Sequence, residues 1–191
     1  MGCLIDDWVL NPNIQDRITA GDVKQAIMKA SPLVKVQIFY LAKRIRKGNW
    51  EHHANKPTME RTIPIFEALI ESDVGGSFHK NHGQLGYALK DKREPDYAQA
   101  EASLTKAIRI RGPWQQSGWV VYEANRATCR IEMDPEFKQG KPSTAKNRAR
   151  ILEDLTVVAA EDTLAPWFER PPFSDWMKLN GVSVESLEAQ W

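Results

Sequence analysis

The sequence predicts an all-α protein built from stacked antiparallel helix pairs. Apolar residues recur at steps of three and four along most of the 191 residues, which is the spacing of one helix face. Prolines and glycines divide the chain into segments of helical length. The content of 42% hydrophobic and 27% charged residues is typical of a globular protein with a sizeable core.

The first thirty residues predict an arm followed by a helix. Met1 to Asn13 mixes apolar and polar residues, and this pattern fits a strand-like arm or a short helix equally. Thr19 to Ala30 has apolar residues at helical steps. Ser31-Pro32 then provides a capping side chain followed by a proline at the first helical position, so a new helix is predicted from Leu33 to Lys47. Its predicted apolar stripe consists of Val34, Ile38, Leu41, Ala42 and Ile45.

A partner for this helix is predicted after a polar turn from Trp50 to Lys56. Pro57 is in position to open the helix, which we expect to continue to about Glu71. Pro64 lies inside the segment and would kink the helix unless it falls in the first turn. Gly75-Gly76-Ser77 is predicted to be a loop.

The stretch from Gln84 to Ile110 carries the clearest pattern, two helical segments with a short polar break. Asp96 is in position to cap the second segment, and Gly112-Pro113 ends it. The aligned residues are Leu85, Gly86, Ala88 and Leu89 in the first segment, and Tyr97, Ala100, Leu104, Ala107 and Ile108 in the second.

These aligned residues resemble a tetratricopeptide repeat, in which two antiparallel helices approach closely at small side chains. Gly86, Ala100 and Ala107 are the small residues of that pattern. The turn from Lys92 to Pro95 is about two residues longer than in the standard unit. The resemblance implies an α-α superhelix whose first helices line a concave, peptide-binding groove.

A third pair and a closing segment are predicted beyond this stretch. The pair comprises Trp119 to Glu132 and, after a break at Asp134-Pro135 and a basic connection, a helix that Ser143 would cap and that runs to about Ala160. The aromatic tail from Leu164 to Met177 resembles the segment that covers the last pair in such repeats. A short final helix is expected from Ser183 to Gln190.

We therefore expect one domain over 1–191, with an arm and helix in 1–30, pairs in 33–71, 79–111 and 119–160, and a cap in 164–191. The matching small residues Ala42, Gly86 and Ala127 recur after about 40 to 45 positions. Tetratricopeptide repeats have a period of about 34, whereas HEAT and armadillo repeats have one of about 40 to 47. A HEAT-like scaffold without a peptide groove is therefore the alternative architecture.

The residues that usually carry catalysis form no recognisable constellation. His79 and His82 are spaced to share a helix face, but no Cys or carboxylate stands at ligand spacing beside them. Cys129 lies within a small-residue stripe, where a buried inert thiol is expected. Gly75-Gly76-Ser77 lacks the lysine of a phosphate loop. We expect no enzyme, no metal and no cofactor; an enzyme would need His79, His82 or Cys129 to converge in a pocket.

Charge and composition restrict the class of partner. The chain has 26 Lys and Arg against 25 Asp and Glu, which argues against nucleic acid. The basic connection around Lys138 and Lys146 lacks interleaved aromatic residues and is predicted to be a solvated turn. No apolar run reaches the length of a membrane span. The two cysteines suggest a reducing compartment, and we expect a cytoplasmic location.

The predicted function is recognition of another protein or peptide, as an adaptor or as the recognition subunit of an assembly. Asn125-Arg126-Ala127 resembles a segment of chaperone-binding tetratricopeptide domains, and this resemblance implies that Asn125 helps to hold a peptide carboxylate. Alternatively, Asn125 bonds only the neighbouring backbone. The predicted groove residues are Lys43, Arg46, Tyr87, Lys90, Asn125 and Arg126.

Overall fold

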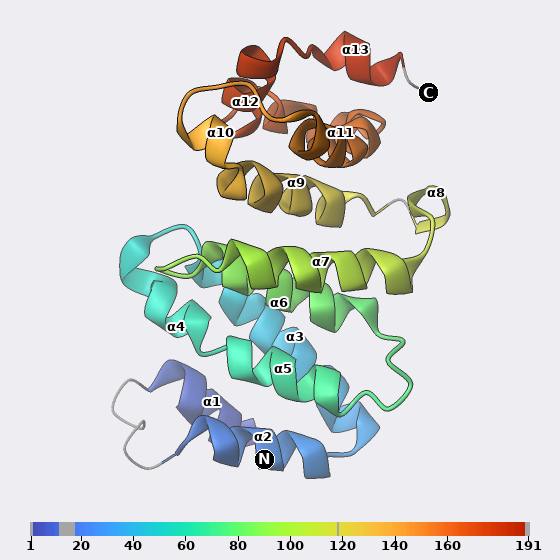
Figure 1. Ribbon diagram of the computed structural model, residues 1–191. Coiled ribbons are helices and arrows are strands. Elements are labelled where there is room, and N and C mark those ends of the chain that lie inside the picture. The colour runs from blue at the N-terminus through green and yellow to red at the C-terminus, as the bar shows by residue number, and fades with distance from the viewer. Residues whose placement is uncertain (1, 12–17, 118, 190–191) are drawn as a thin grey trace. The chain divides into compact units, whose positions relative to one another are not determined.

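The computed structural model describes residues 2–11, 18–117 and 119–189, and all regular structure within these ranges is helical (Figure 1). The all-α prediction is confirmed. The chain divides into two compact units, Met1–Ile110 (unit 1) and Arg111–Trp191 (unit 2). None of the helices within the described ranges is long and apolar enough to cross a membrane.

The arm that the sequence left undecided is a helix, α1 (Gly2–Leu10). Its residues Ile5 and Val9 are buried. The Arg61 guanidinium donates hydrogen bonds of 3.3 Å to the Trp8 and Val9 carbonyl oxygens, and the Trp8 indole donates to the Arg61 carbonyl at 3.2 Å. A basic side chain at a helix C-terminus satisfies carbonyls that have no partner inside the helix. These bonds fasten α1 to the turn that precedes α5.

The next two helices begin where their caps predict. Thr19 caps α2 (Ala20–Lys29), and its side chain accepts a hydrogen bond from the Asp22 amide. Ser31 caps α3 (Pro32–Asn49) in the same way, with Pro32 at the start of the helix. The prediction ended this helix before Gly48, but α3 includes Gly48 and Asn49.

The prediction of one helix between Pro57 and Glu71 is wrong. The segment forms α4 (Lys56–Glu60) and α5 (Ile63–Glu71), and a 3₁₀ helix, His53–Asn55, occupies part of the predicted turn. Pro64 explains the break, because it lies in the first turn of α5, where its missing N–H is tolerated. The buried Thr62 hydroxyl donates to the Met59 carbonyl at 2.6 Å and so satisfies the end of α4.

The central pair forms as predicted, as α6 (His79–Asp91) and α7 (Tyr97–Arg111). Asp96 accepts a hydrogen bond of 3.0 Å from the Gln99 amide, which confirms its capping role. A Cβ atom at Gly86 would lie 2.7 Å from Leu104 Cγ and 3.2 Å from the Ala100 carbonyl oxygen. Only glycine therefore permits this separation of α6 and α7.

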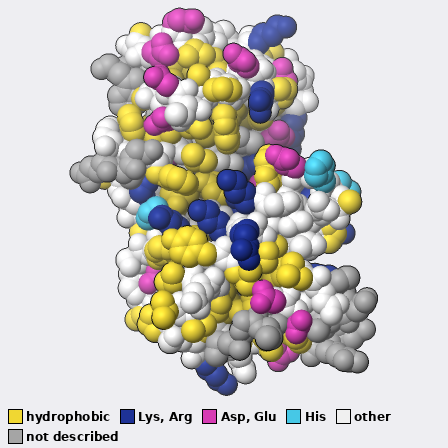
Figure 2. All heavy atoms as spheres, turned by 180° about the vertical axis from the view of Figure 1, so that it is seen from behind, with side chains coloured by type: hydrophobic (Ala, Val, Ile, Leu, Met, Phe, Trp, Pro, Cys, Tyr) yellow, Lys and Arg dark blue, Asp and Glu magenta, His cyan; other side chains and the backbone are white. Residues whose placement is uncertain are grey.

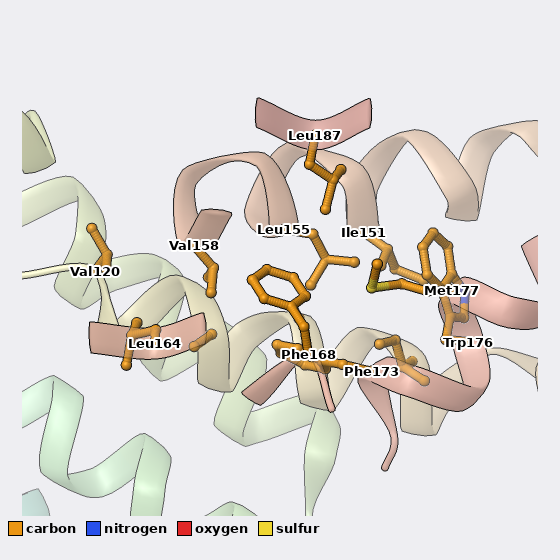
Figure 3. Packing of buried hydrophobic residues seen from close by; sticks show 13 residues of the cluster. Val120, Ile151, Leu155, Val158, Leu164, Phe168, Phe173, Trp176, Met177 and Leu187 are labelled. Atoms are coloured by element: carbon orange, nitrogen blue, oxygen red, sulfur yellow. The ribbon is translucent and has the colours of Figure 1, made fainter. Parts of the chain in front are cut away.

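Unit 2 consists of α9 (Val121–Met133) and α11 (Ala145–Ala159), which pack together, and shorter segments around them. Figure 3 shows the aromatic tail directed into the core beside α11, with Phe168, Phe173 and Trp176 near Ile151 and Leu155. The tail thus belongs to the hydrophobic core of unit 2. The shorter segments are α8 (Trp114–Ser117), α10 (Pro135–Lys138), a 3₁₀ helix (Asp162–Trp167), α12 (Phe173–Asn180) and α13 (Val184–Glu188).

The predicted cap of α11 is off by one residue. Thr144, not Ser143, accepts the hydrogen bond from the Asn147 amide. The Ser143 hydroxyl instead donates a hydrogen bond to the buried Asp134 carboxylate, and it accepts a hydrogen bond of 2.7 Å from the Trp176 indole. Ser143 therefore ties the tail to the end of α9, which no local sequence pattern reveals.

Candidate binding surface of unit 1

The six predicted groove residues fall into both units. Lys43, Arg46, Tyr87 and Lys90 belong to unit 1, whereas Asn125 and Arg126 belong to unit 2. Each group is therefore described within its own unit.

Arg46 joins α3 to α6 and is itself buried. Its Nε donates to Gln84 Oε1 at 2.8 Å, and its Nη1 lies 3.7 Å from Asp91 Oδ2. The guanidinium carbon stands 5.1 Å from the centre of the Tyr87 ring, in a cation–π arrangement. Burial lowers the pKa of Arg46, and the Asp91 carboxylate opposes this effect. The charge of Arg46 is thus compensated inside unit 1.

Lys90 and Tyr87 belong to the same polar cluster. The Lys90 ammonium pairs with Asp91, so this one carboxylate holds two cations. Tyr87 is buried beside Arg46. Lys43 differs, because it is half-buried and no described residue forms a hydrogen bond or ion pair with it.

The two predicted residues of unit 2 are also engaged internally. Asn125 Nδ2 donates to the Val121 carbonyl at 2.8 Å, which is the backbone bond considered as the alternative role. Arg126 is bidentate to Asp154, with Nη2 2.6 Å from Oδ1 and Nε 3.1 Å from Oδ2. Burial raises the pKa of the fully buried Asp154 to about 6, while Arg126 and Arg130 act to lower it. This group is an internal ion pair.

A different surface stands out on α3. Leu33, Val36 and Tyr40 are 70%, 48% and 56% exposed, and their steps of three and four place them on one stripe. The same stripe continues toward the C-terminus of the helix with cations, of which Arg44 and Lys47 are exposed. We call these six residues the α3 stripe: Leu33, Val36, Tyr40, Lys43, Arg44 and Lys47.

The sequence carries a signal for this surface outside the predicted apolar stripe. The predicted apolar stripe of the helix is its inward face, of which Ile38, Ala42 and Ile45 are buried. The apolar residues outside that face mark a helix with a second apolar side. Figure 1 draws α3 behind α5, and Figure 2 shows the molecule from behind, where hydrophobic side chains adjoin several Lys and Arg side chains.

A cleft of about 330 Å³ lies beside the α3 stripe. The rings of Phe39 and Phe78 form part of its wall and meet edge to face, with centres 5.1 Å apart. Asn81 also lines the cleft; the residue is 5% exposed, and its Oδ1 is a buried atom without a hydrogen-bond partner. The other lining residues are Pro32, Lys35, Val36, Leu69, Ser72, Asp73 and Val74.

The residues weighed for catalysis lie in different places. His79 and His82 are half-buried on α6 in unit 1, and Cys129 is fully buried in unit 2. Burial lowers the pKa of His82, and the positive charge of Lys106 lowers it further. Within the described ranges, no three His, Cys, Asp or Glu side chains form a group able to hold a metal ion.

No family model matches the chain, and neither a curated protein nor a solved structure matches it. The resemblance to tetratricopeptide repeats therefore stays a prediction, and the site is interpreted from its own geometry.

Proposed function

We propose that this protein is a protein-interaction module, an adaptor or recognition subunit, whose unit 1 binds a peptide segment of a partner along the α3 stripe. The observation that carries this proposal is the exposure of Leu33, Val36 and Tyr40 on one side of α3, with cations continuing the same line. Covering three aligned apolar side chains that are exposed to water lowers the free energy and therefore favours binding of a partner.

The chemistry of the stripe specifies the peptide. Its first half favours apolar residues, and its second half favours carboxylates next to Lys43, Arg44 and Lys47. We expect a peptide with apolar residues spaced three or four apart at one end and Asp or Glu, or a terminal carboxylate, at the other. Among the residues first predicted, Arg46, Lys90 and Arg126 already pair with carboxylates of the protein, so Lys43 is the one we retain as a contact.

A tetratricopeptide-like stacking of the helix pairs would agree with this proposal. Tetratricopeptide-like pairs would present α3 and α6, the first helices of two pairs, on the binding side. A HEAT-like scaffold without a peptide site is the second candidate, and it gives the α3 stripe no role.

A selection of displayed peptides on the full chain tests this proposal. We expect enrichment of the apolar-then-acidic pattern. Tyr40→Glu should weaken binding at least about tenfold, because it places a charge in the apolar half. Lys47→Glu should weaken it roughly two- to fivefold, with a larger effect at low salt.

The matched control is Lys146→Glu, a charge reversal at another exposed lysine, on α11 of unit 2. It should leave binding unchanged. Selected peptides without acidic enrichment, or with affinities indifferent to Tyr40→Glu, would overturn the proposal and favour the scaffold.

A further inference from the structure

We propose that the α3 stripe binds a partner helix that runs antiparallel to α3, with carboxylates in the first turns of that helix and apolar residues after them. The direction of the helix rests on the proposed function, because it presupposes a partner on the stripe. Three observations carry it: the spacing of the exposed side chains, the helical character of the surface, and the order of apolar and cationic residues along α3.

The side chains of the α3 stripe have the spacing of a helix-packing seam. Leu33, Val36, Tyr40, Lys43 and Lys47 follow one another at steps of three, four, three and four. Side chains repeated in this way interlock with those of a second helix that lies alongside. The stripe is roughly 21 Å long, at about 1.5 Å per residue, so a partner helix of about four turns covers it.

The same surface gives an extended peptide no main-chain partner. The amides and carbonyls in the middle of α3 bond to one another along the helix. All regular structure within the described ranges is helical, so this part of unit 1 presents no strand edge with which an extended segment could pair. A helix satisfies its own main chain and needs only side-chain contacts. The stripe therefore favours a helical segment.

The two halves of the stripe determine where the carboxylates of the partner lie. The exposed apolar side chains stand in the first half, from Leu33 to Tyr40. The second half carries Lys43, which is half-buried, and the exposed Arg44 and Lys47. No described residue forms a hydrogen bond or ion pair with these three cations. They are therefore available to carboxylates of a partner, at the C-terminal end of α3.

The helix dipole sets the direction of the partner. Carboxylates stabilise a helix in its first turn, where amides lack a partner inside the helix, and destabilise it in its last turn. The carboxylates that face the cations therefore satisfy both requirements only if the N-terminus of the partner lies at the C-terminal end of α3. The apolar-then-acidic order along α3 thus corresponds to acidic-then-apolar in the sequence of the partner. A C-terminal carboxylate would lie beside Leu33, away from the cations.

The stripe does not match a second copy of itself. Two α3 helices packed in parallel would bring Lys43, Arg44 and Lys47 against the same cations of the other copy, and like charges repel. Two antiparallel copies would place these cations against the apolar Leu33 and Val36. The partner is therefore a helix of complementary, not identical, sequence.

Two designed peptides test the direction. Both have blocked ends and the same composition, on a background of alanine and glutamine. One has glutamates in its first two turns and leucines, three and four residues apart, in its last two turns; the other has the reverse order. We expect the glutamate-first peptide to bind the full chain about 3- to 10-fold more tightly in calorimetry.

The reverse order also lowers the helix content of the free peptide, so the direction is measured separately with a nitroxide on the N-terminus of the glutamate-first peptide. The nitroxide should broaden the NMR signals of the Arg44 to Asn49 amides much more than those of Leu33 to Val36. Stronger broadening of the Leu33 to Val36 signals would overturn the antiparallel direction.

A covalent staple tests the helical conformation. The staple joins two outward-facing side chains, four residues apart, and holds the glutamate-first peptide in a helix. We expect the affinity to rise at least about threefold, because less conformational entropy is lost on binding. A bound peptide that is extended could not form with the staple in place, so loss of binding would overturn the helical conformation.

Charge reversal on both sides tests the contacts. The double variant Arg44→Glu, Lys47→Glu should weaken the glutamate-first peptide at least about tenfold. The same variant should bind a peptide with lysines in place of the glutamates more tightly than the unchanged protein does. A variant that had merely lost its fold would bind neither peptide, and failure of this exchange in a folded variant would overturn the charge contacts.

The outcomes separate the direction and conformation of the partner from the proposed function. If peptides bind and depend on Tyr40, but the nitroxide lies at the Leu33 end or the staple abolishes binding, this inference fails and the proposed function stands. If neither designed peptide binds, this inference is overturned, and the selection of displayed peptides decides the proposed function by itself.

Discussion

The buried polar groups of unit 1 and unit 2 differ in how completely they are paired. In unit 2, Asp154 is fully buried, and the guanidinium groups of Arg126 and Arg130 both donate to it. In unit 1, the corresponding contact between Arg46 and Asp91 is longer, at 3.7 Å, and the Asn81 amide oxygen accepts no bond at all.

The apolar groups show the same contrast. The aromatic tail of unit 2 turns Phe173 and Trp176 into its own core. Unit 1 exposes an aligned row of three apolar side chains, Leu33, Val36 and Tyr40, whereas in the described part of unit 2 the exposed large apolar side chain is the single Trp119. From this difference we infer that the interactions of unit 2 serve its own stability, whereas unit 1 retains groups that a partner completes.

Arg126→Met should produce the largest loss of stability and tests whether the ion pair of unit 2 is structural. The change leaves the buried Asp154 carboxylate with less compensation, and we expect a cost of about 3 to 5 kcal/mol in the free energy of unfolding at neutral pH, measured in urea. The control is Glu153→Gln, in the same ion-pair group but 62% exposed, which should cost less than about 1 kcal/mol.

The loss should also depend on pH. The pKa of Asp154 is about 6 in the folded chain, above its ordinary value, so the stability from this group is greatest at acid pH and falls as the pH rises through 6. Removing Arg126 removes an effect that lowers this pKa, and the fall then extends to higher pH. The cost of Arg126→Met should therefore be smaller at pH 5 than at pH 8. An equal cost at both values would show that Asp154 does not titrate differently in the variant.

Gly86→Ala should have the next largest effect and probes the closest helix contact of unit 1. The added Cβ would meet Leu104 at 2.7 Å and the Ala100 carbonyl at 3.2 Å, so we expect about 1 to 3 kcal/mol of destabilisation by thermal or urea unfolding. Gly48→Ala on α3 is the control. A Cβ there would meet nothing within 4 Å, and alanine should stabilise the helix by up to about 1 kcal/mol. Similar effects of the two changes would mean that α6 and α7 are not held at this separation.

Local patterns predicted the helices well where their signals lie close in the sequence. Asp96 caps α7 and Gly86 permits the α6–α7 contact, and both follow from neighbouring residues. The break before α5 was missed because apolar steps continue across it. Chain separation also hid the roles of Arg46 and Arg126, since their partners Gln84 and Asp154 lie 38 and 28 residues away. The sequence alone does not show whether a Lys or Arg side chain pairs with a carboxylate of the same protein or with one of a partner.

Glu60→Gln should have the smallest effect and gives the exposed counterpart of the Asp154 pair. Glu60 on α4 accepts from the Arg93 guanidinium at 2.8 Å and from the Arg93 amide at 2.7 Å, which fastens the long turn between α6 and α7. Burial acts to raise the pKa of Glu60, but the hydrogen bonds from Arg93 outweigh it, so the pKa is lowered.

Its contribution to stability is therefore present above the ordinary carboxyl pKa and is lost as the pH falls through the lowered value. Because the Arg93 side chain is 51% exposed, the pair is screened, and we expect Glu60→Gln to cost less than about 1 kcal/mol. In urea titrations, this cost should shrink as the salt concentration rises from about 0.05 M to about 1 M, because salt screens the pair. A cost above about 2 kcal/mol that salt does not change would place the turn among the structural elements of unit 1. The contrast between unit 2, whose groups pair internally, and unit 1, which exposes groups for a partner, would then not include the turn between α6 and α7.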